Sequence, residues 1–184
     1  MGQTHQLKEN KMGYDLHGVN PKEYDKKDYP MLTKWEHKSW DERREEMPED
    51  EEDQYWSEMS KRDKSTGAYF RSNVWWWRQL WNFTCQICDD VMDTWQIDAG
   101  HGNDGIEIDE ETCAEMVPLM KEAIKDGTAA KYEEDVTEYI DSVEKDKNGW
   151  PKDEEQVWAN YPFSKEFFEE FTTFVERSGG FTID

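Results

Sequence analysis

The densest run of apolar and aromatic residues lies between Asn73 and Met92, and its pattern predicts a buried helix. Apolar side chains recur there every three or four residues, the spacing that places them along one face of an α-helix. A large aromatic side chain removes roughly 150–250 Å² from water when it is buried. We therefore expect this helix to form the centre of the core. The predicted buried stripe is Trp76, Leu80, Phe83, Ile87 and Val91, flanked by Trp77, Trp81, Cys88 and Met92.

Three further helices are predicted from apolar residues at helical spacing and from the residues that border them. Asp109 and Ser164 precede two of these segments and carry side-chain oxygens suited to capping a helix N-terminus. Thr128 is expected to cap the third. Gly127 and Gly179 follow two of the helices and are expected to end them.

Alternation of apolar and polar residues at the two ends of the chain predicts two short strands. Residues 12–19 alternate in this way, and so do residues 181–183, which we expect to pair with residues 14–16. The predicted fold is a mostly helical α+β fold. About four to six helices would pack around the Trp-rich helix, beside a small β-sheet made by the N- and C-terminal strands.

The chain is expected to form a single globular domain over residues 12–184, after a disordered lead-in of residues 1–11. Residues 33–64 are the most charged region and are predicted to be an acidic helical insertion, with helix on either side of Pro48. Periodicity leaves open whether this insertion docks on the core or stands out as an arm.

Charge is the second strong property of the sequence. Of the 184 residues, 44 are acidic and 22 are Lys or Arg, which gives a formal net charge of −22. Such a protein repels nucleic acid and anionic membranes and attracts basic partners, so direct nucleic-acid binding is not expected. Ten Trp, eight Tyr and eight Phe favour a folded core over disorder. The charge itself fits either solubility or mimicry of DNA by an inhibitor of DNA-binding proteins.

The remaining composition predicts a cytoplasmic protein without membrane partners. No run approaches the ~20 apolar residues of a membrane span, and the N-terminus lacks the apolar segment of a secretory signal.

Cys85, Cys88 and Cys113 are too few for a disulfide framework. Cys85 and Cys88 form a C-x-x-C pair without a second pair or suitably spaced His residues, so neither a metal site nor a cofactor is expected. Homo-oligomerisation is left open.

The loop Gly100–Gly105 is the leading candidate for a functional site. Its glycines permit close approach of a ligand to the backbone, while His101, Asn103 and Asp104 supply polar groups. The alternative is an ordinary glycine-rich turn. A calcium-binding loop of the EF-hand type does not fit, because glycines would occupy the first and third ligand positions. A weaker cation site involving Asp98, Asp104, Glu107 and Asp109 is left open.

Arg71 and Arg78 flank the aromatic run in a chain where positive charge is scarce. An Arg beside an indole face can stack on a base and pair with a phosphate, although it can equally neutralise a nearby carboxylate. We predict that the helix and the glycine loop close around one ligand site. Its predicted residues are Tyr14, His17, Arg71, Trp75, Arg78, His101, Asn103 and Asp104.

Enzymatic chemistry finds little support in the motifs. The sequence lacks a nucleophile elbow, a phosphate-binding P-loop and a dinucleotide fingerprint. His101 with Asp104 could act as a general acid and base in a small hydrolase, which is kept as an alternative. The prediction leans towards a protein without catalytic activity.

Four stretches of the chain share their order with a known group of proteins: residues 12–21, residues 69–78, residues 100–105 and residues 161–181. In these stretches the chain resembles a family of uncharacterised proteins encoded by phages and their bacterial hosts, which has no assigned activity. The resemblance implies a counter-defence role in the host cytoplasm. The leading prediction is a protein that sequesters a nucleotide-like small molecule, and the alternative is an acidic mimic that inhibits a host defence protein.

Overall fold

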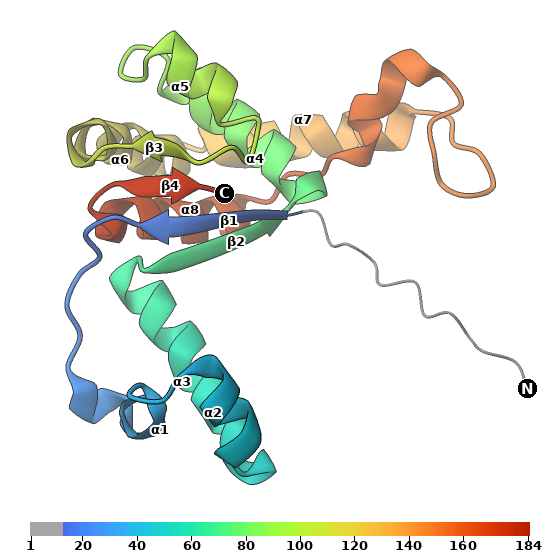
Figure 1. Ribbon diagram of the computed structural model, residues 1–184. Coiled ribbons are helices and arrows are strands. Elements are labelled where there is room, and N and C mark those ends of the chain that lie inside the picture. The colour runs from blue at the N-terminus through green and yellow to red at the C-terminus, as the bar shows by residue number, and fades with distance from the viewer. Residues whose placement is uncertain (1–12) are drawn as a thin grey trace, which may run out of the picture.

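The computed structural model describes residues 13–184, a mostly helical chain arranged around a four-stranded antiparallel sheet (Figure 1). This confirms the predicted α+β class. The described residues contain eight α-helices, more than expected, because short helices such as α5 (Thr94–Ala99) leave little periodic signal in the sequence. The predicted disordered lead-in, residues 1–11, lies outside the described residues.

The sheet has the strand order β2-β1-β4-β3. The predicted pairing between the two ends of the chain is confirmed, but Leu16 lies opposite Ile183 and Gly18 opposite Phe181, so β4 pairs two residues further along β1 than expected. Strands β2 and β3 were not among the predicted strands. Both are too short for a clear alternation. The strands are β1 (Gly13–Gly18), β2 (Tyr69–Asn73), β3 (Ile106–Ile108) and β4 (Phe181–Ile183).

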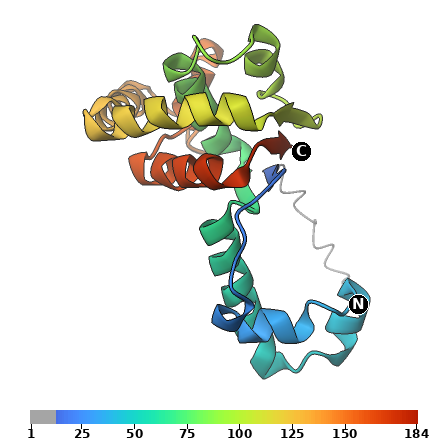
Figure 2. The ribbon, with the colours of Figure 1, turned by 90° about the vertical axis from the view of Figure 1, so that its left-hand side faces the viewer.

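One face of the sheet is buried and the other carries polar side chains. Side chains alternate along each strand, so Tyr14 and Leu16 point into the core while Asp15 and His17 point away from it. Helices α4 (Val74–Ile87), α6 (Glu110–Lys125) and α8 (Lys165–Ser178) supply the core on the buried side. Figure 2 shows α6 and α8 lying side by side.

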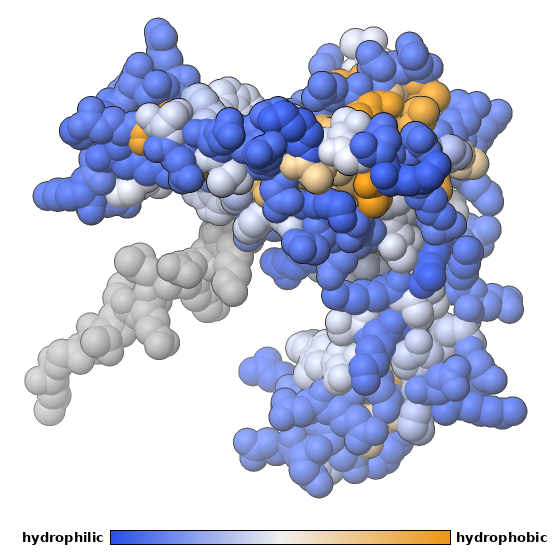
Figure 3. Space-filling view, turned by 180° about the vertical axis from the view of Figure 1, so that it is seen from behind, coloured by the Kyte–Doolittle hydropathy of each residue, from blue (hydrophilic) through white to orange (hydrophobic). Residues whose placement is uncertain are grey.

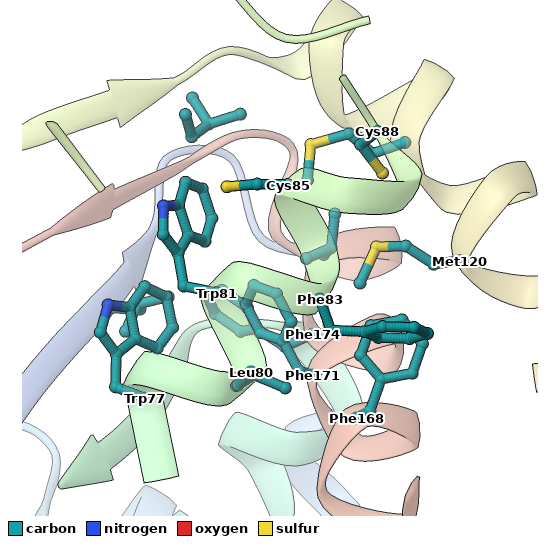
Figure 4. Close-up of a cluster of buried hydrophobic side chains, with 14 of the residues drawn as sticks. Trp77, Leu80, Trp81, Phe83, Cys85, Cys88, Met120, Phe168, Phe171 and Phe174 are labelled. Carbon is teal, nitrogen blue, oxygen red and sulfur yellow. The ribbon is translucent and has the colours of Figure 1, made fainter. Parts of the chain in front are cut away.

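Helix α4 is the centre of the core, although its buried face and its end differ from the prediction. The helix ends at Ile87 instead of continuing to Met92, and Asp89 and Asp90 follow in a turn. Trp77 and Trp81 are fully buried, whereas Trp76 is only half-buried. The helix is covered on two sides, because the two buried indoles lie towards the strands while Phe83 points to α8 (Figure 4). A single stripe therefore underestimates its buried surface.

The predicted caps of α6 and α8 are confirmed. The Asp109 carboxylate accepts a hydrogen bond from the Thr112 amide at 2.8 Å, and the Ser164 hydroxyl accepts one from the Phe167 amide at 3.3 Å. The prediction for Thr128 was wrong. Gly127 occupies the N-cap of α7 (Thr128–Ser142) with a φ of 90°, a conformation that Thr adopts only at a cost. The 3-10 helix η2 (Glu154–Asn160) then connects α7 to α8.

Residues 26–66 form an arm that projects away from the sheet (Figures 1 and 2). Leu32, Trp35 and Tyr55 build a small core of their own within it, separate from the main core. The base of the arm is fixed, because Gly67 lies so close to α8 that an added Cβ would stand 2.5 Å from the main chain of Arg177. The arm consists of η1 (Lys26–Asp28), α1 (Pro30–Trp35), α2 (Trp40–Glu46) and α3 (Glu49–Thr66).

Candidate functional site

The start of α4 positions the first residues of the candidate site. The side chain of Asn73 caps the helix by accepting hydrogen bonds from the amides of Trp75 and Trp76 at 3.0 and 3.1 Å. The cap fixes the first turn, so Trp75 stays at the surface, 39% exposed, while Trp77 enters the core. Arg78 follows on the same turn and is half-buried.

Three buried aromatic side chains hold the glycine loop against this turn. The Tyr14 hydroxyl donates to the carbonyl of His101 at 2.6 Å. The Trp77 indole donates to the carbonyl of Gly100 at 2.8 Å, and the Trp81 indole donates to that of Ile97 at 3.0 Å. Buried indole and phenol groups need such partners, and loop carbonyls supply them here. The loop is therefore an anchored part of the fold.

Arg78 packs against a surface cluster of aromatic rings. Its guanidinium carbon lies 5.8 Å from the centre of the Tyr161 ring. Tyr161 also stacks on Trp75, with ring centres 5.3 Å apart and planes at 30°, and Trp150 and Trp158 adjoin the same pair. The Arg78 Nε is buried and has no hydrogen-bond partner among the residues that the structure describes.

Electrostatics links Arg78 to the glycine loop. Burial lowers the pKa of His101 below its ordinary value of 6.5, and the positive charge of Arg78 lowers it further, while Asp98 opposes both effects. Burial raises the pKa of Tyr14, and the Arg78 charge acts against that rise. The charge of Arg78 on α4 thus affects the pKa of His101 in the glycine loop and that of Tyr14 in β1.

The predicted site residues divide into two groups. Tyr14, Trp75, Arg78 and His101 lie together, and the charge of Asp104 also reaches Tyr14. Asn103 is exposed on the loop nearby.

His17 and Arg71 do not belong to this group, and their inclusion in one site was wrong. They lie on the open face of the sheet, opposite the side that Tyr14 faces. Arg71 is 3.6 Å from the Asp15 carboxylate, and the His17 ring packs 5.2 Å from Tyr69. Strand alternation accounts for the separation, since neighbouring residues in β1 point to opposite faces.

The proposed acid–base pair of His101 and Asp104 lacks a direct electrostatic link. The carboxylate that acts on the pKa of His101 belongs to Asp98. The Asp104 carboxylate instead folds over Gly102, 3.0 Å from where a Cβ would stand.

Sequence reasoning missed Tyr161 and its indole neighbours Trp150 and Trp158. The only signal was the density of aromatic residues beside Pro151 and Pro162 in the last connector. Which helix such a connector covers depends on the tertiary packing, so the sequence did not link it to Arg78.

Thiol and metal chemistry gain no support from the described residues. Cys85, Cys88 and Cys113 are buried, and burial raises the pKa of each thiol to about 12. Across residues 13–184, no three His, Cys, Asp or Glu side chains are grouped so that they could hold a metal ion. In the same part of the chain, no helix has both the length and the apolar character needed to cross a bilayer.

A large cavity lies away from Arg78, beside strand β2. It has a volume of about 460 Å³ and lies between α3 and α8. A second cavity of about 420 Å³ continues from it along the same strand, and the two share Arg71, Phe167 and Glu170 in their walls.

No protein-family model, curated protein or solved structure matches this chain. The resemblance to phage-encoded proteins and the role it implies therefore stay predictions.

Proposed function

We propose that this protein is a non-enzymatic binding protein for a small planar anion of the nucleotide type, held beside Arg78. The main observation behind the proposal is the environment of the Arg78 guanidinium. It packs over the Tyr161 ring, and its buried Nε has no hydrogen-bond partner among the described residues. A guanidinium carries five N–H donors and pairs readily with phosphate oxygens. The Nε itself is buried, so a ligand would meet the positive charge and the terminal N–H groups of this half-buried side chain.

The rings around Arg78 supply surfaces for a base. Trp75 is 39% exposed and packs on Tyr161, and Trp150 is 48% exposed and packs on Trp75. Stacking of a base on an aromatic side chain contributes about 1–3 kcal/mol. His101, whose pKa is lowered by burial and by Arg78, is neutral at pH 7 and can offer the base one donor or one acceptor.

The segment that contains Arg78 does not add to the negative charge of the protein. Residues 67–92 contain two Arg and two Asp and carry no net charge, in a chain with a net charge of −22. An anion is therefore repelled less here than beside the acidic segments of the chain. We expect a monoanionic or dianionic ligand to be favoured over a polyanion.

Thermal-shift and calorimetric titrations with adenosine monophosphate, cyclic AMP and ADP-ribose test the proposal. At least one ligand should raise the melting temperature of the wild-type protein. The variant Arg78→Gln should lose at least about tenfold in affinity, because it removes the charge that meets the phosphate. Arg71→Gln is the matched control and should bind normally, since Arg71 lies on the other face of the sheet. Absence of binding below about 1 mM, or an equal loss in both variants, would contradict the proposal.

Sequestration of a nucleotide signal from a bacterial defence system is the biological role that we attach to this binding. It is supported by the resemblance to phage-encoded proteins, and it would be exerted in the host cytoplasm.

Acidic mimicry through residues 33–64 is a second candidate, favoured by the way these helices project from the sheet. The charge of the arm is moderate, however, because twelve acidic residues are offset by seven basic ones. Lys34 and Lys38 pair with Glu51 and Glu46 inside it. Deleting the arm would abolish inhibition by a mimic and would leave ligand binding at Arg78 intact.

A further inference from the structure

A groove follows the free edge of the sheet along the whole of β2. Strand β2 stands at the end of the strand order, and only β1 pairs with it among the described residues. The cavities of about 460 and 420 Å³ together contact each of its residues, from Tyr69 to Asn73. The walls of the groove come from α3 on one side and α8 on the other.

The main chain of β2 offers hydrogen-bonding groups to this groove. The amides of Asp15 and Val19 bond towards β4, and the amide of Gly18 bonds to the carbonyl of Ala68 beside β2. Antiparallel ladders alternate, so Phe70 and Ser72 bond to β1, whereas the N–H and C=O groups of Tyr69 and Arg71 point outwards. An outward row of this kind can pair with another strand.

The side chains of the groove provide apolar contacts for such a strand. Trp56 is 38% exposed on the α3 wall, Phe167 is half-buried on the α8 wall, and Phe70 forms part of the floor. A strand added beside β2 would direct alternate side chains towards these rings.

We propose that this groove binds an extended basic peptide, which adds to β2 as a fifth strand. The net charge of −22 attracts a basic chain over long range. Asp63, Glu166 and Glu170 line the groove, against Lys64 and Arg71. Asp63 pairs with Arg62 and Glu170 pairs with Lys64, so Glu166 is the lining carboxylate without an ion pair among the described residues. A second copy of this protein would carry another −22 charges to the same edge, so the charge opposes self-association through β2.

A seven-residue peptide that alternates lysine with phenylalanine or valine is the probe. Its binding to the full chain is followed by fluorescence anisotropy, together with two control peptides. One control replaces each lysine with glutamate, and the other carries N-methyl groups on alternate residues, which block strand pairing. We expect each control to bind at least about tenfold more weakly than the probe. Equal binding of either control would overturn the proposal.

The variant Arg71→Pro tests the main-chain contact in the protein. Proline removes the outward N–H but leaves the ladder to β1 intact, and edge strands tolerate it at such positions. Arg71→Ala keeps the N–H and is the matched control. The Pro variant should lose at least about tenfold in affinity and the Ala variant less than about threefold. Equal affinities of the two variants would overturn the proposal.

Amide exchange in the wild-type protein gives a test that does not depend on folding of the variants. The probe peptide should slow exchange at Tyr69 and Arg71. The proposal would be refuted if the peptide slowed amide exchange at other residues but not at Tyr69 and Arg71. A dimer that forms through β2, detected in sedimentation experiments, would also refute it.

Discussion

Gly100 is the residue at which the aromatic core and the candidate site meet. Its φ of −66° suits any amino acid, so the backbone conformation does not require glycine. The requirement is space, because a Cβ on Gly100 would stand 2.2 Å from Cζ2 of Trp81. The Trp81 ring is fully buried and its indole N–H donates a hydrogen bond to the Ile97 carbonyl, so the ring has no room to move. The loop can lie against the indole only when residue 100 has no side chain.

Substitution of Gly100 by Ala should therefore lower the free energy of unfolding by about 3 kcal/mol, the upper end of the usual range for overpacking. Gly102→Ala is the matched control, because its Cβ would meet mainly the Asp104 carboxylate at 3.0 Å, and this exposed side chain can move away. Urea denaturation of the two variants measures the difference. Equal destabilisation would show that the contact with Trp81 does not restrict the loop.

His101 should make stability depend on pH below neutrality. Its pKa is lower in the folded protein than its ordinary 6.5, so the unfolded chain binds the proton more readily. The contribution is complete above about pH 6.5 and is lost as the pH falls from there towards the lowered pKa. Arg78→Gln should raise the pKa of His101 in an NMR titration, and Arg71→Gln should leave it unchanged. An unchanged pKa in Arg78→Gln would disprove the link between helix and loop.

At the scale of elements, a buried carboxylate helps to join two helices of the arm, beside the contacts that Glu51 makes with Lys34 and Trp35. Glu58 of α3 is 7% exposed and accepts hydrogen bonds from the amides of Met31 and Leu32 at 2.8 and 3.0 Å. These amides lie in the first turn of α1, where helix geometry leaves them without internal partners. A short helix of six residues is unstable alone, so its position depends on this contact and on the small core around Tyr55.

Replacement of Glu58 by Ala should release α1 from α3 while leaving the main core folded. Hydrogen bonds to a charged group contribute about 1.5–3 kcal/mol each. Amide exchange over residues 30–35 should rise in this variant, and exchange in α4 should not change. Glu52→Ala is the control, because Glu52 is exposed and bonds only to the Trp56 indole among the described residues. Faster exchange in both regions would show that the arm and the main core unfold together.

Elements were predictable from the sequence where a local signal defines them. The caps Asp109 and Ser164 and the α4 helix were predicted, because capping and periodicity depend on neighbours along the chain. The cap at Thr128 was missed because glycine in the left-handed region can start a helix as well. The predicted ligand site stays a prediction. Sequence reasoning grouped Arg78 with His101, and the Arg78 charge does act on the pKa of His101, but it missed Tyr161, which lies against Arg78 through packing that has no local signature.

At the scale of the whole molecule, negative charge is unevenly distributed. Residues 93–127, which include α5 and α6, contain ten acidic and two basic residues, a net charge of −8. The arm, which holds the longest acidic runs, reaches only −5 over residues 33–64. Figure 3 shows one face of the molecule, mostly hydrophilic with a few apolar areas. Self-repulsion should therefore be strongest around α5 and α6, where carboxylates outnumber their partners.

Salt should stabilise the protein by screening this repulsion. Raising NaCl from about 20 mM to about 500 mM shortens the Debye length from roughly 20 Å to about 4 Å, so repulsion between exposed carboxylates fades. We expect the melting temperature to rise by several degrees in differential scanning calorimetry. Pairs such as Lys34 with Glu51 weaken at the same time, but exposed pairs contribute little to stability.

Two charge-reversal variants separate the effect of carboxylate repulsion on stability from the effect of individual ion pairs. Glu115 is exposed on α6 in the most acidic segment, so Glu115→Lys should raise the melting temperature at low salt, and the gain should shrink as salt is added. Glu51→Lys should lower it, because Glu51 accepts hydrogen bonds from Lys34 and from the Trp35 indole. If net charge alone governed stability, both reversals would be stabilising to the same degree. Opposite signs would instead show that the −22 charge destabilises the fold mainly through carboxylates that lack partners, and that the arm is stabilised by the carboxylates that have them.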